Sequence, residues 1–188
     1  MTPDIRAFEF ALGLFAVLIG LAVVDIATSF HRLLRHRSSV TWDPLALLAA
    51  LYALCMAIYM WFDLWGVRHF AATRHFLFYL SLVAEFLVLF LIAASSLPDE
   101  ANGTSNLRDY YASNRRYYWF LVALFQLGYV GLGIYFVGVK LDFLFTQMIA
   151  PLAIAFVLMA TKSRAVHYAG LGLLFVVMLA HYGPASIN

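Results

Sequence analysis

Long apolar runs separated by short polar segments make up almost the whole chain. Most runs approach the roughly 20 residues that a helix needs to cross the hydrocarbon core of a bilayer. We therefore predict an all-α protein with six membrane-spanning helices and little chain between them. The expected spans are residues 10–34, 44–66, 76–97, 117–139, 143–160 and 165–182.

Polar residues mark where several of these helices begin. Asp43 followed by Pro44 predicts an N-cap and a first helical position, where the missing N–H of proline does no harm. Asn106 is expected to cap a helix that runs through a polar segment into the fourth span. The first helix is expected to continue to Arg37. The first and fourth helices should therefore extend beyond the bilayer.

The composition supports a membrane location. The chain has 188 residues, of which 64% are hydrophobic and 12% charged, and its mean hydropathy is +0.86. Soluble domains have roughly 45–50% apolar and 25% charged residues. We expect one polytopic membrane domain, residues 1–188, whose main partner is the lipid bilayer. A formal charge of +2, with basic residues at span ends, argues against a nucleic-acid-binding face.

The distribution of basic residues predicts the orientation in the membrane. Those expected on one side are Arg32, Arg35, Arg37, Arg108, Arg115, Arg116, Lys162 and Arg164. Those expected on the other side are Arg6, Arg68, Arg74 and Lys140. The positive-inside rule then predicts that both termini lie outside the cytoplasm.

Glu85 is the first candidate functional residue, because it lies in the middle of an apolar run that has no Lys or Arg. Acids at that depth often belong to a proton or solute path. The alternative is a neutral carboxylic acid that hydrogen bonds to a neighbouring helix. Ser81, Gln126, Thr146 and Gln147 are expected to line the same route as Glu85.

Two further features fall within predicted spans. Arg32 lies seven residues after Asp25 and can reach back toward it, which predicts a structural or gating ion pair rather than a transport site. Pro151 lies in the middle of the expected fifth span, where it would kink the helix and free a backbone carbonyl. This kink would act as a hinge or serve only packing.

A basic collar is expected where the first and fourth helices leave the bilayer. It consists of Arg35, Arg37, Arg108, Arg115 and Arg116. We interpret it mainly as a topology and headgroup anchor. The alternative is recognition of an anionic lipid or a protein partner.

The positions of the histidines argue against a bound cofactor, and the lack of a recognisable catalytic motif argues against an enzyme. The six histidines lie near span ends, so they predict neither axial haem ligands at mid-depth nor a zinc site. No nucleophile-and-base motif or phosphate-binding loop is recognisable, which favours a non-enzymatic protein. A membrane enzyme acting on lipid is the third alternative.

Several short strings resemble those of a known group of proteins. They are residues 32–37, 61–65, 97–100, 107–111 and 114–116. In order and spacing they are similar to an uncharacterised group of small bacterial multi-span inner-membrane proteins. The resemblance covers the first four spans and implies an inner-membrane location, with no activity attached.

These observations favour a homo-oligomeric channel or transporter for a cation, protons or a small solute, with Glu85 as the central acid. The competing hypothesis is a scaffold or accessory subunit that docks a protein partner through the basic collar.

Overall fold

The computed structural model describes residues 3–67, 75–99, 105–138 and 149–182, and is all-α apart from two short strands. Four of its helices are long and apolar enough to cross a membrane, and two more are apolar but shorter. The long ones are α1 (Pro3–Arg35), α2 (Pro44–Val67), α3 (Phe76–Ser96) and α4 (Leu107–Leu132), and the shorter ones are α6 (Ala150–Ala160) and α7 (Arg164–Tyr182). The all-α prediction is confirmed, while the count of six spans stays a prediction.

The predicted helix starts are confirmed at two caps. Asp43 accepts a hydrogen bond from the backbone N–H of Ala46 at 3.4 Å, in the first turn of α2. Asn106 Oδ1 accepts from the backbone N–H groups of Arg108 and Asp109 at 3.0 and 3.4 Å, at the start of α4. Each cap satisfies backbone donors that have no partner inside the helix.

A small parallel pair of strands joins the connection between α1 and α2 to the connection between α3 and α4. Residues of β1 (Val40–Thr41) pair with those of β2 (Ser105–Asn106). A short 3₁₀-helix, η1 (Arg37–Ser39), precedes β1, so α1 ends at Arg35 instead of continuing to Arg37. We call the end of the bundle that carries β1 and β2 the strand end.

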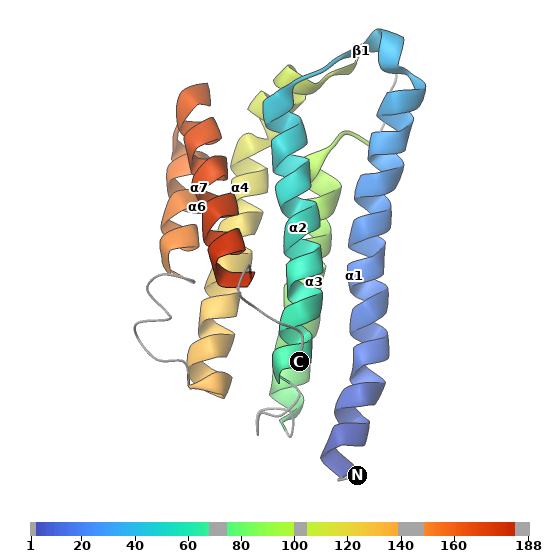
Figure 1. Ribbon diagram of the computed structural model, residues 1–188, viewed down its shortest axis with the longest axis vertical. Coiled ribbons are helices and arrows are strands. Elements are labelled where there is room, and N and C mark those ends of the chain that lie inside the picture. Colours follow the sequence, from blue (N-terminus) through green and yellow to red (C-terminus); the bar gives the residue numbers. More distant parts are fainter. Residues whose placement is uncertain (1–2, 68–74, 100–104, 139–148, 183–188) are drawn as a thin grey trace.

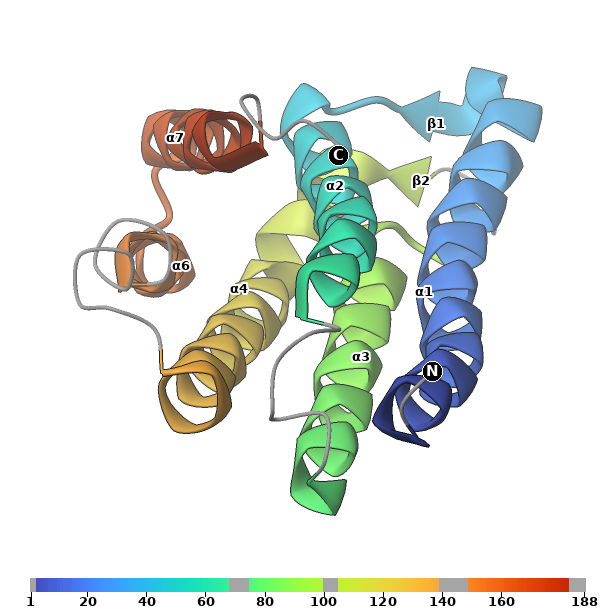
Figure 2. The same cartoon turned by 60° about the horizontal axis from the view of Figure 1, so that its bottom comes forward.

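The helices run alternately up and down, with α4 near the middle of the bundle. In Figure 1, α1 lies on one flank and α6 with α7 on the other, with α2, α3 and α4 between them. The helix α4 packs against both α3 and α6, and α2 contacts α7. Figure 2 shows α7 beside α2 and α6 beside α4. These four helices therefore face one another across one half of the bundle.

One predicted helix end needs correction, and one predicted kink lies partly outside the described residues. The helix α4 continues into a π-helix, η3 (Gly133–Val137), and ends at Gly138, whose φ of 67° is the left-handed conformation that favours glycine. The fourth span therefore ends one residue before the predicted residue 139. Pro151 lies in the first turn of α6, where proline is tolerated, but residues 143–148 of the expected fifth span lie outside the described residues, so the kink stays a prediction.

Candidate functional site

A pocket opens between α2, α4, α6 and α7. Its accessible volume of about 40 Å³ is enough for about three water molecules. The described residues that line it are Tyr52, Met56, Tyr59, Phe125, Gln126, Tyr129, Pro151, Leu174, Val177 and Met178. Two residues predicted from the sequence, Gln126 and Pro151, therefore belong to this site.

Regular spacing brings the polar groups of the pocket together. On α2, Tyr52, Tyr59 and Asp63 follow one another at seven and four residues, which places them along one helix face. On α4, Gln126 and Tyr129 are three residues apart and share a face in the same way. The pocket forms where these two faces meet.

Hydrogen bonds order the polar groups around the pocket. Tyr129 donates its hydroxyl proton to Asp63 Oδ2 at 2.6 Å, a distance typical of a hydroxyl on an ionised carboxylate. The side chain of Tyr59 also lies beside that of Tyr129, with ring centroids 6.5 Å apart. The side chains of Tyr52 and Gln126 both border the pocket.

A second polar network lies closer to the strand end. Trp119 Nε1 donates to the Tyr111 hydroxyl at 3.0 Å, and that hydroxyl lies 2.7 Å from His167 Nδ1. His167 Nε2 lies 3.2 Å from the carbonyl oxygen of Thr161. A carbonyl only accepts, so Nε2 carries the proton, and Tyr111 donates to Nδ1 of a neutral imidazole. His167 is only 1% exposed.

The two networks adjoin through aromatic rings, since the centroids of Tyr52 and Trp119 are 6.3 Å apart. On α4, Tyr111, Trp119, Gln126 and Tyr129 all fall on one side of the helix. Together the polar groups extend from the pocket toward the strand end. We call this set the polar column, and it consists of Asp63, Tyr129, Tyr59, Gln126, Tyr52, Trp119, Tyr111 and His167.

Glu85 lies outside the polar column. Its side chain is 6% exposed, and its Oε2 atom is buried without a hydrogen-bond partner. The carboxyl group packs against Gly128 of α4. At about 100° per residue, Gly128 and Gln126 point to nearly opposite sides of α4. The helix α4 therefore separates Glu85 from the pocket.

The other residues predicted for a route with Glu85 are also apart from the pocket. The hydroxyl of Ser81 donates to the carbonyl of Leu77 in its own helix at 2.7 Å. Ser81 is therefore satisfied locally and need not contact a solute. Thr146 and Gln147 lie outside the described residues.

The predicted ion pair between Asp25 and Arg32 is replaced by other contacts. Arg32 donates to the backbone carbonyl of Asp99, in the connection that follows α3. The Oδ2 atom of Asp25 is buried and has no hydrogen-bond partner. The exposed Arg32 side chain reaches Asp99 because the strand pair brings this connection to the end of α1.

The basic collar divides into one residue that is bonded within the fold and four whose side chains have no partner among the described residues. Arg115 donates through Nε to the carbonyl of Thr161 at 3.0 Å, so it holds the turn between α6 and α7 against α4. Within the described part of the chain, four side chains of the collar are exposed and form neither an ion pair nor a hydrogen bond. They are Arg35, Arg37, Arg108 and Arg116.

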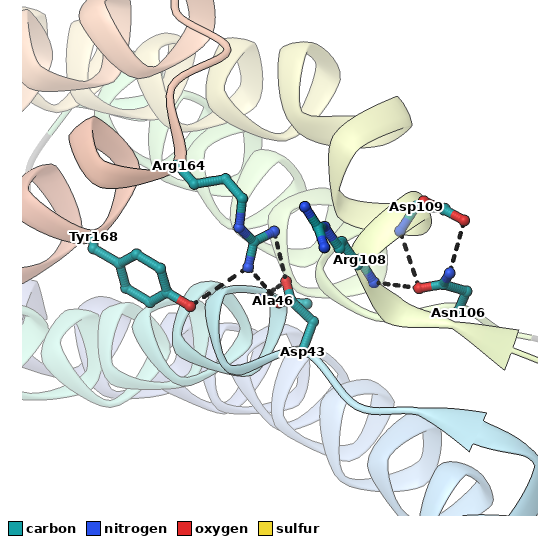
Figure 3. A network of polar contacts seen from close by, with 7 residues as sticks. All are labelled: Asp43, Ala46, Asn106, Arg108, Asp109, Arg164 and Tyr168. Atoms are coloured by element: carbon teal, nitrogen blue, oxygen red, sulfur yellow. Dashed lines mark hydrogen bonds and ion pairs between the residues drawn. The ribbon is translucent and has the colours of Figure 1, made fainter.

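An ion pair that the sequence did not predict lies beside the collar. Arg164 Nη2 is 2.5 Å from Asp43 Oδ1, and its guanidinium group lies 5.9 Å from the ring centre of Tyr168. Figure 3 shows these three side chains together, with Arg108 pointing toward them from the first turn of α4. The hydrogen bond to Asp43 raises the pKa of Arg164, so this side chain stays charged.

No group of three or more His, Cys, Asp or Glu side chains converges within the described residues. The polar column instead offers hydroxyl, amide, carboxylate and imidazole groups on aromatic frames. This chemistry exchanges protons and binds water.

Comparisons with protein-family models, with curated proteins and with solved structures found no match to this chain. The resemblance drawn from the short strings therefore stays a prediction.

Proposed function

We propose that this chain is an integral membrane protein that conducts protons along the polar column. Several apolar helices of membrane-spanning length support the membrane location. The observation that carries the proposal is the pocket between these helices, bordered by Tyr52, Tyr59, Gln126 and Tyr129. Polar groups inside a membrane bundle are costly, and they are found where a path or a site needs them.

The size of the pocket favours protons over a larger solute. Sites for small molecules typically measure about 300–1,000 Å³. The space of about 40 Å³ found here holds water and little else. A metal cation would need several converging oxygen ligands, whereas a proton needs only a chain of hydrogen bonds.

The route would begin at Asp63 and Tyr129, pass through water in the pocket between Gln126 and Tyr52, and continue to Tyr111 and His167. Hydrogen bonds already link Asp63 to Tyr129 and Tyr111 to His167. The segment between the two networks is aromatic, so water from the pocket must bridge it. We place Glu85 outside this route.

Proton flux into liposomes tests the proposal. Purified protein is reconstituted in vesicles that contain a pH-sensitive dye, and a potassium gradient with valinomycin supplies the driving voltage. We expect Tyr129→Phe to slow acidification on the order of a hundredfold, the contribution typical of one positioned proton-transfer group. The reason is that this variant removes the hydroxyl between Asp63 and the pocket.

The matched control is Tyr117→Phe, which makes the same chemical change at an exposed position of α4. Its flux should equal that of the unmodified protein. Equal flux in both variants, or no flux above that of empty vesicles, would contradict the proposal. A Glu85→Gln variant separates the two routes, because a loss of flux there would favour the path predicted from the sequence.

A scaffold or accessory subunit is the second candidate function. The exposed collar residues Arg35, Arg37 and Arg116 support it, because they have no acidic partner among the described residues. Affinity purification from native membranes tests this candidate. A stoichiometric partner that is lost on charge reversal of Arg37 and Arg116, together with absent proton flux, would favour docking over conduction.

A further inference from the structure

Two arginine side chains, Arg108 and Arg164, lie at the strand end, where α2, α4 and α7 meet. Arg164 is held by Asp43, with guanidinium-to-carboxylate distances of 2.5 and 3.4 Å. Figure 3 shows the Arg108 side chain directed toward this pair. Among the residues drawn, Asp43 pairs with Arg164, while the carboxylate of Asp109 accepts a hydrogen bond from the amide of Asn106 and forms no ion pair with Arg108.

The helix that carries Arg108 does not stabilise the positive charge of this side chain. It lies in the first turn of α4, where the helix dipole disfavours a cation. Its backbone N–H is used by the Asn106 cap, and its side chain has no partner among the described residues. An anionic group from outside the chain would supply the hydrogen-bond acceptor that the Arg108 side chain lacks.

The surroundings favour a lipid as the source of that anion. Tyr168 is 39% exposed beside Arg164, and further along α7 the side chains of Leu173, Val176 and Leu179 are exposed. Aromatic residues of this kind are enriched at the level of lipid headgroups, and the exposed apolar face offers a surface for acyl chains. A headgroup phosphate would then lie between Arg108 and Arg164.

We propose that Arg108 and Arg164 bind the phosphate of an anionic phospholipid whose acyl chains lie along α7. Arginine suits this task because its planar guanidinium group gives two parallel hydrogen bonds to phosphate oxygens. Asp43 orients Arg164 and keeps the site from holding more than one anion. The inference does not depend on proton conduction.

Native mass spectrometry of the full chain, titrated with phosphatidylglycerol or phosphatidylcholine, tests this site. Arg108→Lys keeps the charge and removes the paired hydrogen bonds, so we expect binding of phosphatidylglycerol to weaken about tenfold, as for one lost charged hydrogen bond. The matched control, Arg116→Lys, changes an exposed arginine of the same helix and should bind unchanged.

Three outcomes would overturn the inference. The first is an equal effect of both substitutions, which would indicate only general surface charge. The second is equal binding of phosphatidylcholine, which carries no net charge. The third is displacement of the lipid by millimolar inorganic phosphate, which would make free phosphate the ligand.

Discussion

A single glycine, Gly128, allows α4 to contact the carboxyl group of Glu85 on α3. A Cβ atom built on Gly128 would lie 1.6 Å from Glu85 Oε1, far inside van der Waals contact. The carboxyl group of Glu85 therefore occupies the space that any other residue at position 128 would fill. At Gly131, one turn further along, a Cβ atom would meet nothing within 4 Å.

We expect Gly128→Ala to be less stable than Gly131→Ala by about 1 kcal/mol, the low end of the usual cost of overpacking, because the end of the Glu85 side chain must move away from the added Cβ atom. Thermal unfolding in detergent measures the change. Gly131→Ala is the control, and it should be neutral or stabilising because alanine favours helix by about 1 kcal/mol. Combining Gly128→Ala with Glu85→Ala should recover part of the loss. Equal midpoints of thermal unfolding for the two glycine variants would contradict the contact between Glu85 and Gly128.

Asp43 has two roles, since one carboxyl group caps α2 and pairs with Arg164. Asp43→Asn keeps the cap and removes the charge, whereas Asp43→Ala removes both. We expect the alanine variant to be less stable than the asparagine variant by about 1 kcal/mol, the typical value of an N-cap. Unfolding midpoints in the same detergent compare them, and identical midpoints would show that the cap contributes nothing.

At the level of secondary-structure elements, the short turn between α6 and α7 is held to α4 at one carbonyl group. Thr161 accepts hydrogen bonds from both Arg115 and His167. The ion pair between Asp43 and Arg164 fastens the start of α7 to the start of α2. The two shorter helices are thereby fixed to the rest of the bundle at the strand end.

Loss of the Tyr111 hydroxyl should loosen this attachment. In Tyr111→Phe the buried Nδ1 of His167 has no donor, which costs about 1–3 kcal/mol. Lys162 is exposed in the turn, so trypsin should cleave after it faster than in the unmodified protein. Tyr117→Phe, at a position that is 48% exposed, is the control. Unchanged cleavage in Tyr111→Phe would mean that the hydrogen bond between Tyr111 and His167 does not hold the turn between α6 and α7.

The elements that the sequence predicted well are those fixed by local interactions. Asp43 and Asn106 were recognised as caps because a cap involves only its own helix. The depth of Glu85 followed from its position in an apolar run, but its neighbour, Gly128, depends on how α3 and α4 pack. The Tyr52, Tyr59 and Asp63 face was overlooked, although its helical spacing was a signal available in the sequence.

In the whole molecule, α2 and α4 are the central helices, because α2 contacts α1, α3 and α7, and α4 contacts α3 and α6. On one side, α1 and α3 form an apolar layer that includes the contact between Phe15 and Phe86, whose ring centres are 5.2 Å apart. On the other side, α2, α4, α6 and α7 surround the pocket. The polar column lies within one protomer, so conduction along it needs no second copy of the chain.

The presence of water in the pocket is the central claim, and hydroxyl-radical footprinting of the protein in lipid nanodiscs tests it directly. Met56 and Met60 have nearly equal exposure, 4% and 3%, but only Met56 lines the pocket. If water fills the pocket, radicals formed there oxidise Met56 and Met178 much faster than Met60. Equally slow oxidation of all three methionines would mean a dry pocket and would contradict the account.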